Sequence, residues 1–315
     1  MMSTPHDRVV ALARRQDDVV TSEQARQLGM SDDALSRRRR HGWSSPLQGA
    51  LLIPPVRDEV RARARAAQSV LGGTICGRTA ARLHHLPGLA AFRSDEPTDL
   101  ALPTGNRRRD RTGYRRRRLE LRDSDIVDLG GLRVCTVPRT LEDLALLCDR
   151  EEFVSVVDAM LFAGQLAAAD VLDLRGRVSA RPNGRRARGW WDRIDGRAES
   201  PLETRVRLLL GDFGLLPDEC QWPVCDPTTG RFVARVDFAW PSLRLAVEAD
   251  GVGPHSVPAA LYRDRFRQNA LVRLRWEILR FTWWDVTVGA AQLVKMVGAA
   301  VRAAESRRGD DASPY

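Results

Sequence analysis

The stretch "LAVEADGVGPHS", residues 245–256, ends a short apolar run in two acidic residues. Glu248 and Asp250 are two residues apart, so their side chains leave the same face of a β-strand. The preceding segment "RFVARVDFAW", residues 231–240, carries Asp237 and is joined to this run by only a few residues. A hairpin with so short a turn places Asp237 opposite Glu248 or Asp250. The sequence therefore predicts three clustered carboxylates at one end of a sheet.

These three carboxylates are candidate ligands of a metal ion. Clustered carboxylates repel one another when they are ionised, and a bound cation relieves that repulsion. Sites built only from oxygen ligands favour Mg²⁺ or Mn²⁺ over zinc. We therefore expect Asp237, Glu248 and Asp250 to hold one Mg²⁺ or Mn²⁺ ion. Gly251, directly after the acids, permits a close approach of the backbone.

Two further residues near this cluster each have two interpretations. Glu203 lies in "SPLE" at the start of a predicted helix, where it either caps the helix together with Ser200 or reaches the metal and orders its water. His255 follows the acids in a predicted loop. It is either an ordinary loop residue or a general base that moves protons or contacts a phosphate. The sequence leaves both pairs of alternatives open.

The order of elements around the cluster predicts the fold of residues 186–305. An amphipathic helix at 200–214 precedes three strands, and the short connections "DPTTG" and "PS" make both strand pairs antiparallel. A helix at 257–275, the strand "WEILRF" and a last helix follow. This α-β-β-β-α-β order predicts a mixed sheet with helices on both faces.

This region resembles a known nuclease family. A helix with Glu203, a strand with Asp237, and "VEADG" with the downstream His255 resemble the very-short-patch-repair-like endonuclease domain of the PD-(D/E)xK superfamily. The segment "YRDRFRQNALVRLRWEILRFTWWDV", residues 262–286, is similar to it as well. The resemblance implies a restriction-endonuclease-like core that hydrolyses DNA phosphodiester bonds with a divalent metal.

One residue departs from the superfamily's pattern. Its E-x-K motif has lysine at the position of Asp250 here, and Lys295, far along in the last helix, is the only lysine in the chain. Arg267 or His255 are the candidates to replace that lysine. Arginine stays protonated at neutral pH and therefore cannot act as a base.

Residues 1–57 predict a winged helix-turn-helix DNA-binding domain. A helix, a short helix capped by Thr21 and Gln24, a turn at Gly29 and a second short helix precede a hairpin in "WSSPLQGALLIP". The second short helix carries four consecutive arginines that would contact DNA, or else form a solvated basic face: Arg37, Arg38, Arg39 and Arg40.

Residues 58–180 predict an α+β middle domain, and "RPNGRRARG", residues 181–189, reads as a linker. In the middle domain, residues 106–118 carry eight arginines around a Thr-Gly turn and predict a basic hairpin. Residues 1–175 resemble antitoxins of abortive-infection type IV toxin–antitoxin systems, through residues 19–54, "CGRTAARLHHLPG" and "VPRTLEDLA". That resemblance implies operator DNA as a partner and a toxin, or second protein, encoded nearby.

The amino-acid composition limits which classes of protein and partner remain possible. The net charge of +9 over 315 residues favours a polyanionic partner such as DNA. Five cysteines without a CxxC spacing argue against a disulfide framework or a zinc site. No apolar run is long enough for a membrane span and the N-terminus lacks a signal-peptide core, so we expect a cytoplasmic protein with no membrane partner.

The sequence thus predicts an α/β (α+β) chain with two alternative functions. The first is a DNA-binding protein with a metal-dependent endonuclease domain. The alternative is a transcriptional regulator of antitoxin type, whose nuclease-fold domain is non-catalytic. A nuclease site should keep its carboxylates turned inward around one space the size of a cation.

Overall fold

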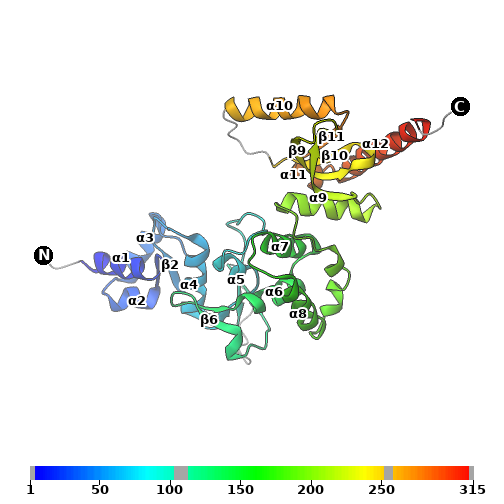
Figure 1. Ribbon diagram of the computed structural model, residues 1–315. Helices are drawn as coiled ribbons and strands as arrows, with labels where there is room; N and C mark the ends of the chain where they lie inside the picture. Colours follow the sequence, from blue (N-terminus) through cyan, green and yellow to red (C-terminus); the bar gives the residue numbers. More distant parts are fainter. Residues whose placement is uncertain (1–3, 103–112, 252–257, 312–315) are drawn as a thin grey trace. The chain divides into compact units, whose positions relative to one another are not determined.

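The computed structural model describes residues 4–102, 113–251 and 258–311. Within the last of these ranges, side chains are described only for residues 265–308. The chain has a mixed α/β structure made of two compact units (Figure 1). Unit 1 contains the described residues of 1–86, 90–148 and 172–187, and unit 2 contains those of 87–89, 149–171 and 188–315.

The N-terminal part of unit 1 begins with three helices and one short strand. These are α1 (Pro5–Arg15), β1 (Val19–Thr21), α2 (Ser22–Gln27) and α3 (Asp32–Arg40). The predicted capping box of α2 is present, because Thr21 Oγ1 accepts from Gln24 N at 3.0 Å and Gln24 Oε1 accepts from Thr21 N at 2.8 Å. Gly29 has a φ of +92° in the turn between α2 and α3.

The strand β2 (Ala50–Leu52) pairs differently from the predicted hairpin. It runs antiparallel to β1, whereas its pairing with the preceding segment is limited to one bridge between Ser44 and Leu52. All three residues of β2 are buried. Leu51 packs with the helices α1 to α3, and Leu52 packs on α4 (Glu59–Leu71) through Ala62 and Ala66. The two faces of β2 therefore pack in two clusters, one with the helices α1 to α3 and the other with α4.

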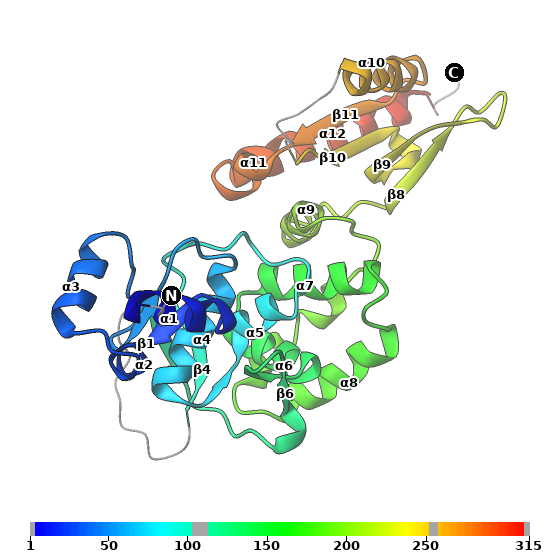
Figure 2. The same cartoon turned by 90° about the vertical axis from the view of Figure 1, so that its left-hand side faces the viewer.

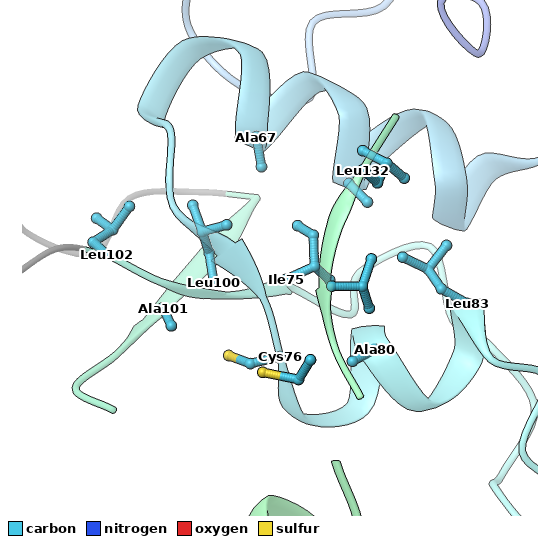
Figure 3. Close-up of a cluster of buried hydrophobic side chains, with 12 residues drawn as sticks. Ala67, Ile75, Cys76, Ala80, Leu83, Leu100, Ala101, Leu102 and Leu132 are labelled. Carbon is cyan, nitrogen blue, oxygen red and sulfur yellow. The ribbon is translucent and has the colours of Figure 1, made fainter. Parts of the chain in front are cut away.

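The rest of unit 1 is built on a five-stranded sheet with the order β5-β4-β3-β7-β6. Its strands are β3 (Thr74–Ile75), β4 (Thr98–Ala101), β5 (Tyr114–Arg117), β6 (Ile126–Asp128) and β7 (Arg133–Cys135). The helices α5 (Gly77–Leu83), α6 (Val137–Leu147) and α8 (Ala168–Ser179) complete this part of the chain. Figure 3 shows the core of this sheet, with Ile75, Cys76 and Leu100 packed against α4 and α5.

The basic segment predicted as a hairpin falls partly outside the described residues. Its described part forms β5, which pairs with β4 in parallel rather than with a strand of its own. Arg117 of β5 donates to the buried Asp99 of β4 at 2.9 Å. At least one arginine of this segment therefore has a structural partner and does not simply face solvent.

Unit 2 follows the predicted element order. It contains α7 (Arg150–Phe162), α9 (Pro201–Asp212), β8 (Glu219–Cys225), β9 (Phe232–Trp240), β10 (Leu245–Ala249), α10 (Pro258–Arg273), β11 (Glu277–Phe281), α11 (Trp283–Thr287) and α12 (Ala290–Asp311). The sheet order is β11-β10-β9-β8. The strands β8, β9 and β10 form antiparallel pairs, and β10 and β11 are parallel.

Helices cover both faces of this sheet, as the sequence predicts. Leu245 and Val247 of β10 pack with α9 and α12, while Ala246 packs with Leu271 of α10. Alternate residues of one strand thus enter two separate cores. Figures 1 and 2 show α10 and α9 on opposite sides of the sheet.

A buried ion pair fastens α9 to α7. Asp158 of α7 is fully buried, and its Oδ2 accepts from Thr204 Oγ1 at 2.8 Å and from Arg207 Nη2 at 2.7 Å. Its Oδ1 accepts from the backbone nitrogen of Asp195 at 2.7 Å. Residues 149–171, which the sequence places at the end of the middle domain, therefore pack with unit 2.

Among the helices that the structure describes, none combines the length and the apolar character that crossing a membrane requires.

Candidate nucleic-acid interface and carboxylate site

The C-terminal half of α3 presents a basic surface. Ser31 caps the helix through its side-chain oxygen, and Leu35 is its buried contact with the core. The four arginines that follow, Arg37 to Arg40, are all exposed. Their place in the last turn also suits the negative end of the helix dipole.

These four arginines differ in their partners. Arg39 Nη2 donates to Ser22 Oγ at 3.2 Å, which ties it to the start of α2. Within the described ranges, Arg37, Arg38 and Arg40 form no ion pair with a carboxylate. Of the two acids at the start of α3, Asp32 pairs with Arg26 at 2.9 Å, and Asp33 forms no ion pair with these arginines in the described ranges. Three exposed guanidinium groups are therefore available to an anion.

The second candidate site lies where β9 and β10 pair. Ala246 pairs with Ala239 and Val247 with Phe238, so the same register places Asp237 opposite Glu248. Asp237 Oδ2 accepts from the backbone nitrogen of Ala249 at 2.8 Å. Burial raises the pKa of Asp237 above its ordinary value. The short turn thus brings Asp237 beside the strand end, as the sequence predicts.

Glu248 is bound by two arginines. It is buried, and Arg267 of α10 donates to its Oε1 while Arg280 Nε donates to its Oε2 at 3.0 Å. Arg280 is also its partner in the parallel register of β10 and β11. Burial, together with the neighbouring Arg280, lowers the pKa of Arg267. Both oxygens of Glu248 are thus already engaged.

Gln221 of β8 lies between Glu203 and Asp237 and bonds to both. The sequence analysis did not predict it as a site residue. Its Nε2 donates to Glu203 Oε2 at 2.8 Å and, at 3.4 Å, to Asp237 Oδ1. Its Oε1 is buried and has no hydrogen-bond partner in the described parts of the chain. Its strand position could have indicated this role, because the register that pairs Cys220 with Phe238 places Gln221 opposite Asp237.

Glu203 both caps and joins this cluster. Ser200 Oγ accepts from Glu203 N at 3.2 Å, as a helix cap requires. The return bond of the predicted capping box goes instead to the preceding residue, because Glu203 Oε2 accepts from Glu199 N at 2.9 Å. Glu203 is buried, and this burial raises its pKa, with a smaller contribution from Asp237.

Of the remaining predicted site residues, one is exposed and one lies outside the described ranges. Asp250 is exposed, and its backbone nitrogen donates to Phe281 O at 2.8 Å. His255 lies outside the described residues. In the parts that are described, no three Asp, Glu, His or Cys residues are grouped to hold a metal ion. The ion shared by Asp237, Glu248 and Asp250 stays a prediction, and Glu248 would bind it only after an arginine releases it.

Comparison with known proteins bears on the N-terminal site. Residues 7–43 match the model of a family described as transcriptional regulator, AbiEi antitoxin. That match runs from α1 through the whole of α3. The chain is also 35% identical over 159 residues to an uncharacterized protein of Mycobacterium tuberculosis strain CDC 1551, and to an uncharacterized protein of strain H37Rv. The aligned part is 49% of this chain and 56% of each relative, so the chain spans about half the length of the curated relatives it matches.

Proposed function

We propose that the chain binds duplex DNA through α3 and acts as a transcriptional regulator of antitoxin type. The observation that carries this proposal is a set of exposed arginines at the end of α3 that have no carboxylate partner among the described residues: Arg37, Arg38 and Arg40. The family match at residues 7–43, whose description names a transcriptional regulator, supports it.

The chemistry of this surface suits phosphate contacts. Arginine offers several N–H donors in a planar fork, which matches phosphate oxygens. Contacts of this kind position a protein on the duplex, whereas base contacts specify the sequence. We therefore assign affinity to these arginines and make no assignment of the operator sequence. The family's description as an antitoxin also leads us to propose a toxin, or another protein encoded nearby, as a second partner.

The Arg37→Gln/Arg40→Gln variant tests the DNA-binding surface. Each lost phosphate contact should reduce the log–log slope of affinity against salt by about 0.9, so the double variant should lose roughly 1.8. The measurement is fluorescence anisotropy with duplex DNA from upstream of the protein's own gene, at about 50 to 200 mM salt. Glutamine keeps the helix propensity close to that of arginine, so α3 should remain folded.

The matched control for this variant is Arg15→Gln/Arg185→Gln. It removes the same charge from exposed positions of unit 1 that lie outside α3. We expect the slope of this control to equal that of the wild type. Equal slopes for all three proteins would reject α3 as the DNA-binding surface, and absence of salt-dependent DNA binding by the wild type would reject the function.

A second candidate function is metal-dependent hydrolysis of DNA at the carboxylate site of unit 2. The observation in its favour is the Gln221 amide, whose NH₂ group lies between Glu203 and Asp237. A hydrogen-bond donor between two carboxylates occupies a place suited to a cation. The amide also carries a buried oxygen without a partner in the described ranges, so the donor set fits a hard cation such as Mg²⁺ or Mn²⁺.

In this second function, Glu203 and Asp237 would hold the ion, which supplies Lewis acidity and an activated water. Glu248 and Asp250 are further proposed ligands, and His255 is proposed to move protons. Arg267 and Arg280 hold Glu248 in place. Their positive charge, beside the cluster, would attract a DNA phosphate.

Thermal unfolding in the presence of Mg²⁺ or Mn²⁺ tests this second function. A metal that binds only the folded chain stabilises it by about 2.7 kcal/mol at a roughly hundredfold excess over Kd. We expect this stabilisation for the wild type and for the control Asp218→Asn, an exposed acid, but much less for Asp237→Asn. If the wild type gains no stability from metal, with or without DNA, the metal site is rejected.

A further inference from the structure

A cavity of about 550 Å³ lies in unit 2, lined by β8, by the segment before β10 and by the segment between α10 and β11. Arg244 directly precedes β10 and Trp276 directly precedes β11, so the cavity is at the beginning of both parallel strands. The strand β8 and the end of α10 contribute the other walls. The lining residues that matter most are Trp222, Arg244, Arg273, Arg275 and Trp276.

The charge of this cavity is one-sided. Among the described residues, three arginines line it and no carboxylate does. In the described parts of the chain, no ion pair joins Arg244, Arg273 or Arg275 to an acid. Asp226, which lies between two lining residues in the sequence, turns its Oδ1 to the backbone nitrogens of Thr228 and Thr229 at 2.8 and 3.0 Å. The Asp226 charge also interacts with Arg273, but three arginines beside one acid leave the cavity net positive and complementary to an anion.

Two of the three arginines have a backbone conformation that L residues rarely adopt. Arg244 has a φ of +51° and Arg275 has a φ of +60°. Non-glycine residues in this region are uncommon and concentrate at functional sites. The two positions are coupled, because Glu277 N, next to Trp276, donates to Arg244 O at 2.9 Å. Both conformations belong to turns that end helices, since Arg275 N donates to Val272 O at 2.9 Å and Arg244 N donates to Pro241 O at 3.2 Å.

Two tryptophans add aromatic surface to this cationic cavity. Trp222 and Trp276 are partly buried and pack against the core formed by Val224, Ala246 and Leu271. That core restrains the rings, while both still contribute to the wall of the cavity. Aromatic rings next to cationic side chains are the combination on which unpaired bases stack in single-stranded nucleic acids.

We propose that this cavity binds an unpaired nucleotide of a single-stranded DNA segment. The base stacks on Trp222 or Trp276, and the arginines neutralise the adjoining phosphates. The volume lies within the range of roughly 300–1,000 Å³ in which small-ligand pockets fall. The site is distinct from α3. Trp222 directly follows Gln221 of the carboxylate cluster, but Glu203, Asp237 and Glu248 do not line the cavity, so its test is independent of the functions proposed above.

Cys225 provides a local probe of this site. It lines the cavity and is exposed, whereas Cys76, Cys135 and Cys148 are buried and Cys220 is partly buried. Burial also raises the pKa of Cys220 to about 11, which keeps that thiol protonated near pH 8. Reaction of the native full chain with a thiol reagent should therefore begin at Cys225, and an occupied cavity should slow it.

The experiment compares three ligands at equal nucleotide concentration. An oligothymidylate of roughly 12 nucleotides, long enough for typical single-strand sites, should slow the reaction of Cys225. A blunt duplex of the same length should not, because its bases are paired. Protection by thymidine monophosphate at the same concentration would overturn the proposal and indicate a free-nucleotide site. No protection by the oligothymidylate would overturn it as well.

Substitutions in the cavity distinguish specific binding of the oligothymidylate from attraction to the net charge of the protein. Arg244→Asn/Arg275→Asn removes two guanidinium groups, and asparagine tolerates the left-handed backbone better than most residues. We expect its affinity for the oligothymidylate to fall about tenfold, since two phosphate contacts are lost. Trp276→Leu should weaken binding roughly 5- to 150-fold if the ring stacks on a base. Circular dichroism should confirm that each variant is folded.

The control is Arg302→Gln/Arg308→Gln, two exposed arginines of α12, which removes the same charge elsewhere in unit 2. We expect it to bind the oligothymidylate as the wild type does. Equal loss of affinity in the control and in the asparagine variant would show that only net charge matters. That outcome would overturn the assignment of the cavity.

Discussion

Asp158→Ala is expected to destabilise unit 2 by about 3–5 kcal/mol, the range for removing one member of a buried ion pair. The substitution leaves Arg207 buried without its carboxylate, with both side chains nearly inaccessible in the wild type. It also removes the acceptor for Thr204 Oγ1 and for the backbone nitrogen of Asp195. Buried donors without acceptors cost free energy individually.

Urea unfolding followed by tryptophan fluorescence measures this effect. Seven of the eight tryptophans lie in unit 2, so the signal reports mainly on that unit: Trp190, Trp191, Trp222, Trp240, Trp276, Trp283 and Trp284. The expected result is a lower urea midpoint for Asp158→Ala with a slope close to that of the wild type.

Asp212→Ala is the matched control, because it breaks a second ion pair between the same two helices. Arg150 of α7 donates to both oxygens of Asp212 in α9, and this contact lowers the pKa of Asp212. Asp212 is exposed, so solvent screening should limit the loss to under about 1 kcal/mol. Equal losses in the two variants would contradict the structural role assigned to Asp158.

The ion pair also bears on the carboxylate site. Thr204 directly follows Glu203, and Arg207 lies one turn further along α9. Anchoring these residues to α7 fixes the first turn of α9, from which Glu203 reaches Gln221. A loosened α9 should therefore weaken the metal-dependent stabilisation that the second proposed function predicts, even though Asp158 is not a proposed ligand.

Gly88→Ala is expected to destabilise unit 2 by at least about 3 kcal/mol, through a backbone clash that adds to conformational strain. Gly88 has a φ of +85°, and a Cβ there would lie 2.3 Å from Ser155 O and 2.7 Å from Val156 Cα. Both contacts involve the backbone of α7, which cannot move aside as a flexible side chain does. Urea unfolding followed by tryptophan fluorescence again provides the measurement.

Gly164→Ala isolates the conformational part of this effect. Gly164 also has a positive φ, +66°, and lies just after α7, but a Cβ there would meet nothing within 4 Å. We expect it to cost about 1–2 kcal/mol, the strain of the left-handed conformation alone. If Gly88→Ala costs no more than Gly164→Ala, the close packing of Gly88 on α7 is wrong.

Local features of the sequence determined where many elements begin and which strands are neighbours. Thr21 and Ser200 cap their helices as predicted, because a cap depends on bonds between residues only a few positions apart. The short connection between β9 and β10 likewise placed Asp237 beside Glu248, since a tight turn leaves an antiparallel pair little choice of register.

Only the tertiary structure decided what these residues contact. Arg280 reaches Glu248 because β10 and β11 lie side by side in parallel after a long helical crossover, which no local pattern specifies. Gln221 joins Glu203 to Asp237 across three separate elements, and Asp158 draws α7 into unit 2 through Arg207. Each of these contacts brings together distant parts of the chain. Their formation depends on how whole layers pack against one another. The sequence alone therefore determined where the acids lie along their strands, and the tertiary structure determined which residues they contact.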